Sequence, residues 1–97
     1  PEPQPGIPLG DVLRACPAMT AYHDGPCRTW GDLARVADRV APWLGIDGAT
    51  WGRARTRMGP AMAAATLAAM VEKATAIRNP GGYLRNLTDR FDRGGFS

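Results

Sequence analysis

Residues 60–77 are apolar on almost every side of the helix that their spacing predicts, and Glu72 is the first charge to interrupt them. A helix at a protein surface carries its apolar side chains on one stripe, whereas a helix that is apolar all round is normally buried among its neighbours. Much of the stretch is alanine, and its bulk comes from Met62, Leu67, Met70 and Ile77. We therefore expect a central helix that other helices approach closely.

Prolines and glycines divide the rest of the chain into short segments. The pair Gly59-Pro60 places a glycine just past one predicted helix and a proline at the first position of the next, where each is favoured. Pro42 should kink or break an apolar helical stripe near Val40, and Gly45 should end it. The predicted helices cover residues 9–16, 29–44, 48–58, 60–77 and 80–93, with a short helical turn at 17–22.

Polar side chains at three predicted helix starts can accept hydrogen bonds from free backbone amides. Thr29 precedes one helix and Asp32 lies three residues on, close to the spacing of a capping box. Asp47 and Asn79 precede two further helices. No stretch alternates with a period of two residues, so we predict no strands. The expected fold is all-α: a small orthogonal bundle of about five helices around the alanine-rich one.

The length of the chain indicates one domain, because 97 residues leave no room for a second core. Residues 1–8 contain four prolines and a glycine. Proline fixes φ and lacks an amide donor, so we predict a semi-extended, Pro-rich linker at 1–8 and a helical domain at 9–97. Because the chain begins with Pro1 rather than Met, we expect it to be part of a longer protein.

The sequence lacks the patterns of membrane and secreted proteins. Its nearest approach to a membrane span, residues 61–71, falls short of the roughly 20 apolar residues required, and no secretory signal pattern is present. Cys16 and Cys27 are therefore interpreted as reduced thiols rather than as a disulfide, and we expect Cys16 to lie in the core. We expect a cytoplasmic protein with no membrane partner.

Residues that commonly carry catalysis are scarce. The one histidine, His23, stands beside Asp24 in a predicted loop, and Cys27 is near enough in sequence to contact its imidazole. The spacing places no nucleophile beside this base, so we favour an ordinary loop with a capping aspartate. There is no recognisable metal-ligand spacing and no phosphate-binding glycine loop after a strand. We predict no enzyme, no catalytic residue, no metal, no cofactor and no small-molecule substrate.

Charge is unevenly distributed along the chain. Residues 1–48 contain four basic and six acidic residues, a net charge of −2, whereas residues 49–97 contain eight basic and three acidic residues, a net charge of +5. Eleven of the twelve basic residues are arginine, whose guanidinium forms forked hydrogen bonds to phosphates and carboxylates. The C-terminal half is therefore the candidate partner-binding half.

Two arginines of the predicted helix 48–58 point away from its apolar face. Arg53 and Arg57 are separated by one turn and lie opposite Trp51, so they suit either a surface for DNA or an acidic protein, or a solvated face. Arg55 flanks the Trp51 stripe, and we expect it to cover the core edge or to pair with an aspartate.

The segment Asn79-Pro80-Gly81-Gly82 combines a cap with two glycines at a helix start. Free amides and the helix dipole favour an anion at such a position, and Arg78 and Arg85 flank this one. Alternatively, the glycines allow close packing against the alanine-rich helix while Asn79 simply caps, and we favour this reading.

The last predicted helix carries an apolar stripe of Tyr83, Leu84, Leu87 and Phe91. On its exposed side, Arg85, Asp89 and Arg93 are spaced to form successive ion pairs one turn apart. The candidate DNA- or partner-binding residues are Arg53, Arg57, Arg78, Gly81, Gly82, Arg85, Arg90 and Arg93.

Short motifs run through the chain in a definite order. They are Ala15-Cys16-Pro17, Trp30-x-Asp32-Leu33, Leu44-Gly45-Ile46, Trp51, Met58-Gly59, Pro80-Gly81-Gly82-Tyr83-Leu84-Arg85-Asn86-Leu87-Thr88 and Gly95-Phe96-Ser97. In this order and spacing, residues 9–97 resemble the C-terminal domain of replication protein C (RepC), the initiator of repABC-type low-copy plasmids of alphaproteobacteria. The block at 81–88 is the distinctive motif.

The resemblance implies a cytoplasmic, non-enzymatic protein that starts plasmid replication at its origin. Specific DNA binding in this family is ascribed mainly to an N-terminal winged-helix region, so plasmid origin DNA is a partner of the full-length protein. For the domain itself we favour a protein-interaction module that recruits host replication proteins or another copy of itself. The alternative is an auxiliary DNA-binding domain that contacts phosphates through the arginines of the C-terminal half, with affinity that falls steeply with salt.

Overall fold

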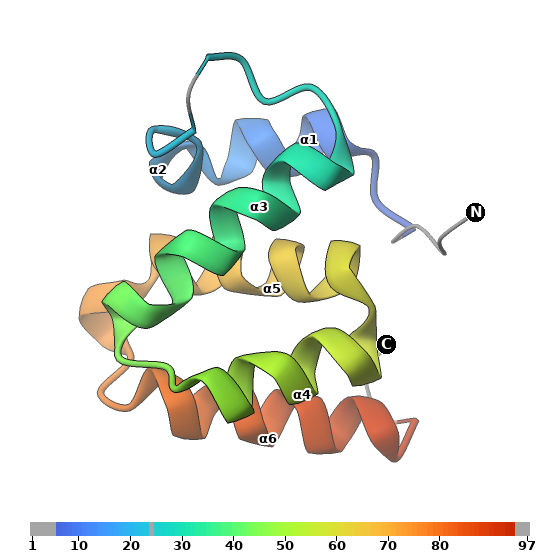
Figure 1. Cartoon of the computed structure of the whole chain (residues 1–97), viewed down its shortest axis with the longest axis vertical. Coiled ribbons are helices and arrows are strands. Elements are labelled where there is room, and N and C mark those ends of the chain that lie inside the picture. Colours follow the sequence, from blue (N-terminus) through green and yellow to red (C-terminus); the bar gives the residue numbers. More distant parts are fainter. Residues whose placement is uncertain (1–5, 24, 95–97) are drawn as a thin grey trace.

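Helix α5 (Pro60–Glu72) lies at the centre of the structure, as the alanine-rich stretch predicts (Figure 1). It packs against four other helices of the bundle. Three of its alanines, Ala63, Ala64 and Ala68, have no exposed surface. Because a methyl group is the smallest side chain that fills such a position, these alanines let the neighbouring helices approach α5 closely.

The computed structural model describes residues 6–23 and 25–94, and in these ranges every regular element is helical. The all-α prediction is confirmed. The other elements are α1 (Leu9–Ala15), α2 (Pro17–Thr20), α3 (Trp30–Val40), the 3₁₀ turn η1 (Ala41–Leu44), α4 (Gly48–Met58), the 3₁₀ turn η2 (Ala74–Ala76) and α6 (Pro80–Asp92). Residues 1–5 of the predicted linker lie outside the described residues, so the linker stays a prediction.

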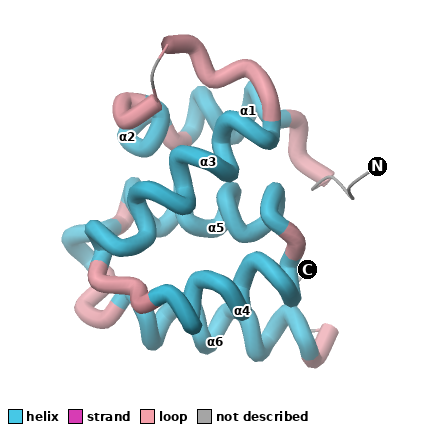
Figure 2. The backbone as a smooth tube through the Cα atoms, in the orientation of Figure 1, coloured by secondary structure: helices cyan, strands magenta, loops and turns pink. Residues whose placement is uncertain are grey.

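The helices form two layers. In Figures 1 and 2, α3 and α4 are the nearer helices, and α1, α5 and α6 lie behind them, with α1 above α5 and α6 below it. The molecule measures 33 × 30 × 21 Å, and the figures look along the shortest of these axes. The layer of α1, α5 and α6 therefore provides one of the two broad faces of the protein.

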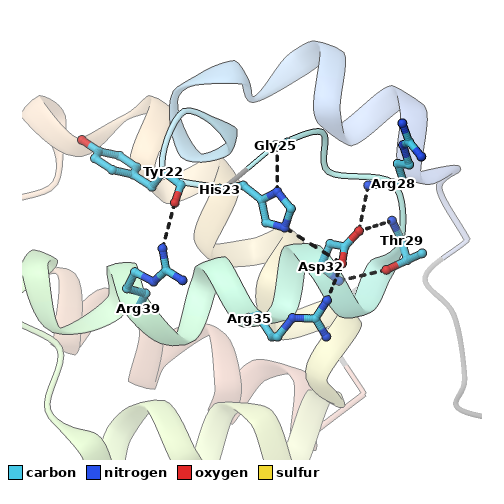
Figure 3. A network of polar contacts seen from close by, with 8 residues as sticks. All are labelled: Tyr22, His23, Gly25, Arg28, Thr29, Asp32, Arg35 and Arg39. Carbon is cyan, nitrogen blue, oxygen red and sulfur yellow. Dashed lines mark hydrogen bonds and ion pairs between the residues drawn. The ribbon is translucent and has the colours of Figure 1, made fainter.

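Caps predicted from the sequence hold the helix starts. The Thr29 side chain accepts a hydrogen bond from the Asp32 amide at 3.0 Å, and the Asp32 carboxylate accepts one from the Thr29 amide at 3.2 Å, which completes a capping box (Figure 3). Asp47 caps α4 by accepting from the Thr50 amide at 2.7 Å. Helix α3 ends at Val40, as the prolyl ring two residues on predicts.

A single residue, Gly59, separates α4 from α5 (Figure 2). Its φ of 87° lies in the region that favours glycine, and Pro60 follows at the first position of α5, as predicted. The predicted extent of α5 was wrong, because the helix ends at Glu72 rather than Ile77. Residues 73–76 are exposed, so no packing face holds them in an α-helix, and they form the η2 turn instead.

The core lies between the two layers. Its largest fully buried apolar side chains are Met19, Leu33, Val36, Leu67 and Leu84, which come from four helices, α2, α3, α5 and α6. Cys16 is buried beside them, as predicted. Each of the six α-helices contributes at least one buried side chain to this core.

Candidate functional site

Helix α6 is bound to α4 by ion pairs that cross between the helices. Arg53 contacts Asp89 at 2.9 Å and Asp92 at 3.2 Å, and Arg57 contacts Asp92 at 3.7 Å. We call these four residues the α4–α6 seam. The expectation that Arg85, Asp89 and Arg93 pair along α6 was wrong: Asp89 pairs with Arg53 of α4, which approaches because the two helices pack together.

The seam continues at the start of α4, where Arg85 donates a hydrogen bond to the Thr50 hydroxyl at 3.3 Å. The pKa of Asp47 is lowered by hydrogen bonds from the Thr50 amide and hydroxyl, and the positive charge of Arg85 adds to this effect. Arg53, Arg57 and Arg85 thus have partners within the chain.

The two glycines at the start of α6 lie beside the capping residue Asn79. Asn79 accepts a hydrogen bond from the Gly82 amide at 3.0 Å, and a Cβ on Gly82 would lie 3.0 Å from Nδ2 of Asn79. A Cβ on Gly81 would come within 4 Å only of Arg85 and Asn79. The predicted packing of these glycines against α5 was therefore wrong, because the atoms nearest to such a Cβ belong to Asn79 and Arg85. At Gly82, the missing side chain makes room for the cap. The capping itself was predicted correctly.

The remaining candidate arginines are Arg78, Arg90 and Arg93, which are exposed. Within the described part of the chain, none of the three forms an ion pair or a side-chain hydrogen bond. Arg78 precedes α6 and Arg93 caps its end, so the length of the helix separates them. The structure does not gather the eight candidate residues into one site.

Arg55 behaves as predicted and contacts Asp38 of α3 at 3.5 Å. The same carboxylate accepts a hydrogen bond from the indole of Trp51 at 2.8 Å. Arg55 is therefore part of the α3–α4 contact rather than of a partner-binding surface.

The loop around His23 is held against the start of α3 (Figure 3). The imidazole contacts the Gly25 carbonyl at 2.9 Å and lies 4.0 Å from Asp32, which also pairs with Arg35. The pKa of Asp32 is lowered, chiefly by the hydrogen bond from the Arg28 amide. Asp24, the neighbour considered in the sequence, lies outside the described residues.

Cys27 lacks the environment of a catalytic thiol. Burial and the nearby charge of Asp32 raise its pKa, and this disfavours the nucleophilic thiolate. Within residues 6–23 and 25–94, no three His, Cys, Asp or Glu side chains are grouped closely enough to hold a metal ion. The arrangement of the loop therefore fits a structural clamp.

Two apolar grooves flank α5 on the broad face of the molecule. The α5–α6 groove has a volume of about 200 Å³ and is lined by Thr66, Ala69, Met70, Lys73, Tyr83 and Leu87. The α1–α5 groove has a volume of about 280 Å³ and is lined by Ile7, Asp11, Val12, Ala15, Cys16, Ala65 and Ala69. Ala69 is common to both, so the grooves lie side by side.

Large apolar side chains project beside these grooves. Tyr83 is 40% exposed and Ile7 is 54% exposed, although Tyr83 had been assigned to the apolar stripe of α6. The sequence does not predict this surface, because the spacing within one helix does not reveal a gap between two helices. The signal that could have found it is the position of Tyr83 at the edge of its stripe.

A pair of exposed aromatic rings lies between the residues that follow α2 and the η1 turn. The rings of Tyr22 and Trp43 meet edge to face, with centroids 5.1 Å apart, and they are 47% and 61% exposed. Arg39 donates to the Tyr22 carbonyl at 3.1 Å and fixes the backbone beneath the pair (Figure 3). The sequence analysis did not single out Trp43.

Comparison with known proteins identifies the family. Residues 8–97 match the family described as replication protein C C-terminal region. The chain belongs to this family. The replication protein C resemblance seen in the motifs is therefore confirmed, and the matched residues include every helix of the structure.

Two curated relatives carry the name of replication protein C. One, from Rhizobium rhizogenes, is 42% identical over 97 residues, and one, from Sinorhizobium fredii, is 41% identical over 97 residues. Each match covers 99% of this chain and 24% of the relative, so the chain spans about a quarter of the length of these relatives. No solved structure matches the chain. In the described residues, no helix is long and apolar enough to cross a membrane.

Proposed function

We propose that this replication protein C domain is a non-catalytic protein-interaction module that supports initiation of plasmid DNA replication. The observation that carries the proposal is the contrast between its charged and its apolar surface. Arg53, Arg57 and Arg85 are held by groups of the same chain, whereas the two grooves beside α5 present apolar side chains to solvent. Exposed, contiguous apolar surface commonly marks a protein-binding site.

Auxiliary DNA binding is the second candidate, and the exposed arginines favour it. Arg78, Arg90 and Arg93 are available for phosphates, and the net charge of +3 attracts polyanions. However, a protein bound through phosphates needs several cations on one surface, and the two at the ends of α6 are a helix length apart. The proposal therefore places DNA binding second.

A salt titration separates these functions. At physiological salt, we expect the chain to bind labelled duplex or single-stranded DNA no more tightly than the non-specific range of about 10⁻⁴–10⁻⁶ M. Binding well below micromolar Kd at that salt, with affinity that falls steeply as salt rises, would replace the interaction module with the DNA-binding alternative.

A cellular competition experiment tests the module directly. In cells whose plasmid depends on a full-length replication protein C, excess of this chain should lower the plasmid copy number by occupying the partner. Ala69→Arg, which fills the floor shared by the two grooves, should abolish that effect. A double variant, Arg78→Ala with Arg93→Ala, is the control and should retain it. An unchanged copy number with the wild-type chain, or the reverse pattern between the two variants, would overturn the proposal.

A further inference from the structure

The broad face made by α1, α5 and α6 has an apolar centre with opposite charges on its two sides. At the centre, Ala65 and Ala69 of α5 form a low floor between the grooves. Ile7 projects on the α1 side and Tyr83 projects on the α6 side. A partner must therefore offer projecting apolar groups on both sides of a shallow centre.

The charges of this face are arranged by side. On the α1 side, Asp11 lines the groove. Glu72 lies near the start of α2, where its carboxylate accepts a hydrogen bond from the Ala18 amide at 2.9 Å. On the α6 side, Lys73 lines the groove, and Arg90 continues the line of Tyr83 and Leu87 along the helix. Arg14 pairs with Asp11 and is the cation of the α1 side.

Such a face is complementary to itself. Rotation by 180° about an axis that lies in the face, parallel to α5, sets the α1 side of one copy opposite the α6 side of the other. Because this rotation keeps each residue at its level along α5, Tyr83 of each copy would meet the α1–α5 groove of its partner, and Lys73 would meet the partner's Glu72. Two-fold contacts require this pairing of unlike groups, because every contact occurs twice.

We propose that the α1–α5–α6 face docks against a second copy of this chain in a symmetric dimer. This inference rests on the proposed function and names its partner. The face belongs to the 33 × 30 Å side of the molecule, which is large enough for the roughly 800 Å² per partner that stable interfaces bury. The exposed alanine floor lets the two α5 helices approach closely, and the charges select the orientation.

The mass in solution tests the dimer. Sedimentation equilibrium should give a mass that rises with concentration from 10.4 kDa toward twice that value. Ala69→Arg should hold the protein at the monomer mass without lowering its melting temperature, because Ala69 is exposed. A monomer at every concentration, or a dimer that Ala69→Arg leaves intact, would overturn the proposal.

A charge exchange tests the orientation. Glu72→Lys and Lys73→Glu should each weaken the dimer about tenfold or more when alone, because each places like charges opposite each other twice. When the two variants are mixed, opposite charges face each other at both contacts, and the mixture should form a heterodimer as tight as the wild-type dimer. Arg28→Glu, an exposed change in the loop before α3, is the matched control and should dimerise normally. Equal association of each variant with itself and with the other would exclude this orientation.

These results separate the inference from the proposed function. If the chain is monomeric but Ala69→Arg still abolishes competition in cells, the second copy is the wrong partner and the interaction module stands. If the chain dimerises as described but never alters plasmid copy number, the proposed function is wrong while the dimer stands.

Discussion

The two sides of α6 face their neighbouring helices with different kinds of side chain. Toward α4, the helix is joined by the Arg53, Arg57, Asp89 and Asp92 seam. Toward α5, it leaves an open apolar groove with Tyr83 on its edge. Charge therefore closes a contact within the chain, whereas the apolar groove stays open to solvent. This distribution is the reverse of what the arginine-rich C-terminal half suggests when the sequence is read alone.

The largest effect is expected when one leucine in the core and one leucine in the groove are truncated. Leu84 is fully buried and Leu87 lines the groove. Leu84→Ala should lower the free energy of unfolding by about 2–5 kcal/mol, because it leaves a cavity. Leu87→Ala should cost about 1–2 kcal/mol, because its side chain is already partly in water. Urea denaturation measures both, and equal losses would show that the groove is closed in solution.

Breaking the α4–α6 seam should lower the free energy of unfolding by a smaller amount. Arg53→Ala removes two ion pairs, but its side chain is 43% exposed, so we expect a loss of about 1 kcal/mol or less. The loss should shrink as salt is added, because salt screens exposed charges. Arg93→Ala is the control, with a change of about 0.5 kcal/mol or less. If thermal unfolding shows the same loss for both variants, the seam does not hold α6 to α4.

The smallest effect is expected on the pH dependence of stability. The lowered pKa of Asp47 means that its contribution to stability is complete above the unfolded carboxyl pKa of about 3.9 and is lost as the pH falls through the lower folded value. Asp47→Asn keeps a capping oxygen and removes the charge near Arg85. The stability of this variant should therefore depend less on pH below about 4 than that of the wild type, as followed by circular dichroism during acid titration. Superimposable acid transitions would contradict this assignment.

Local signals in the sequence predicted local structure well. The Thr29–Asp32 capping box, the Asp47 and Asn79 caps and the Gly59-Pro60 junction form within a few neighbouring residues, so their spacing was sufficient. The buried α5 was predictable because its apolar character extends around the whole helix.

The candidate site was predicted less well, because it depends on which helices become neighbours. Arg53 was predicted to face outward, and it does, but α6 brings Asp89 and Asp92 to it from 36 and 39 residues away. The spacing of one helix contains no information about such partners. Likewise, the grooves exist because α1 and α6 flank α5 at a distance, and no motif records that arrangement.

Gly59 alone joins α4 to α5, so the two helices meet at a tight corner. Helix α6 is joined to α4 by the seam, and it forms one wall of the groove that it shares with α5. The seam therefore acts together with the buried Leu84 on the position of α6 beside this groove. Raising the ionic strength weakens the seam and should therefore let α6 tilt relative to α5. Salt would thus change the shape of the groove without changing the residues that line it.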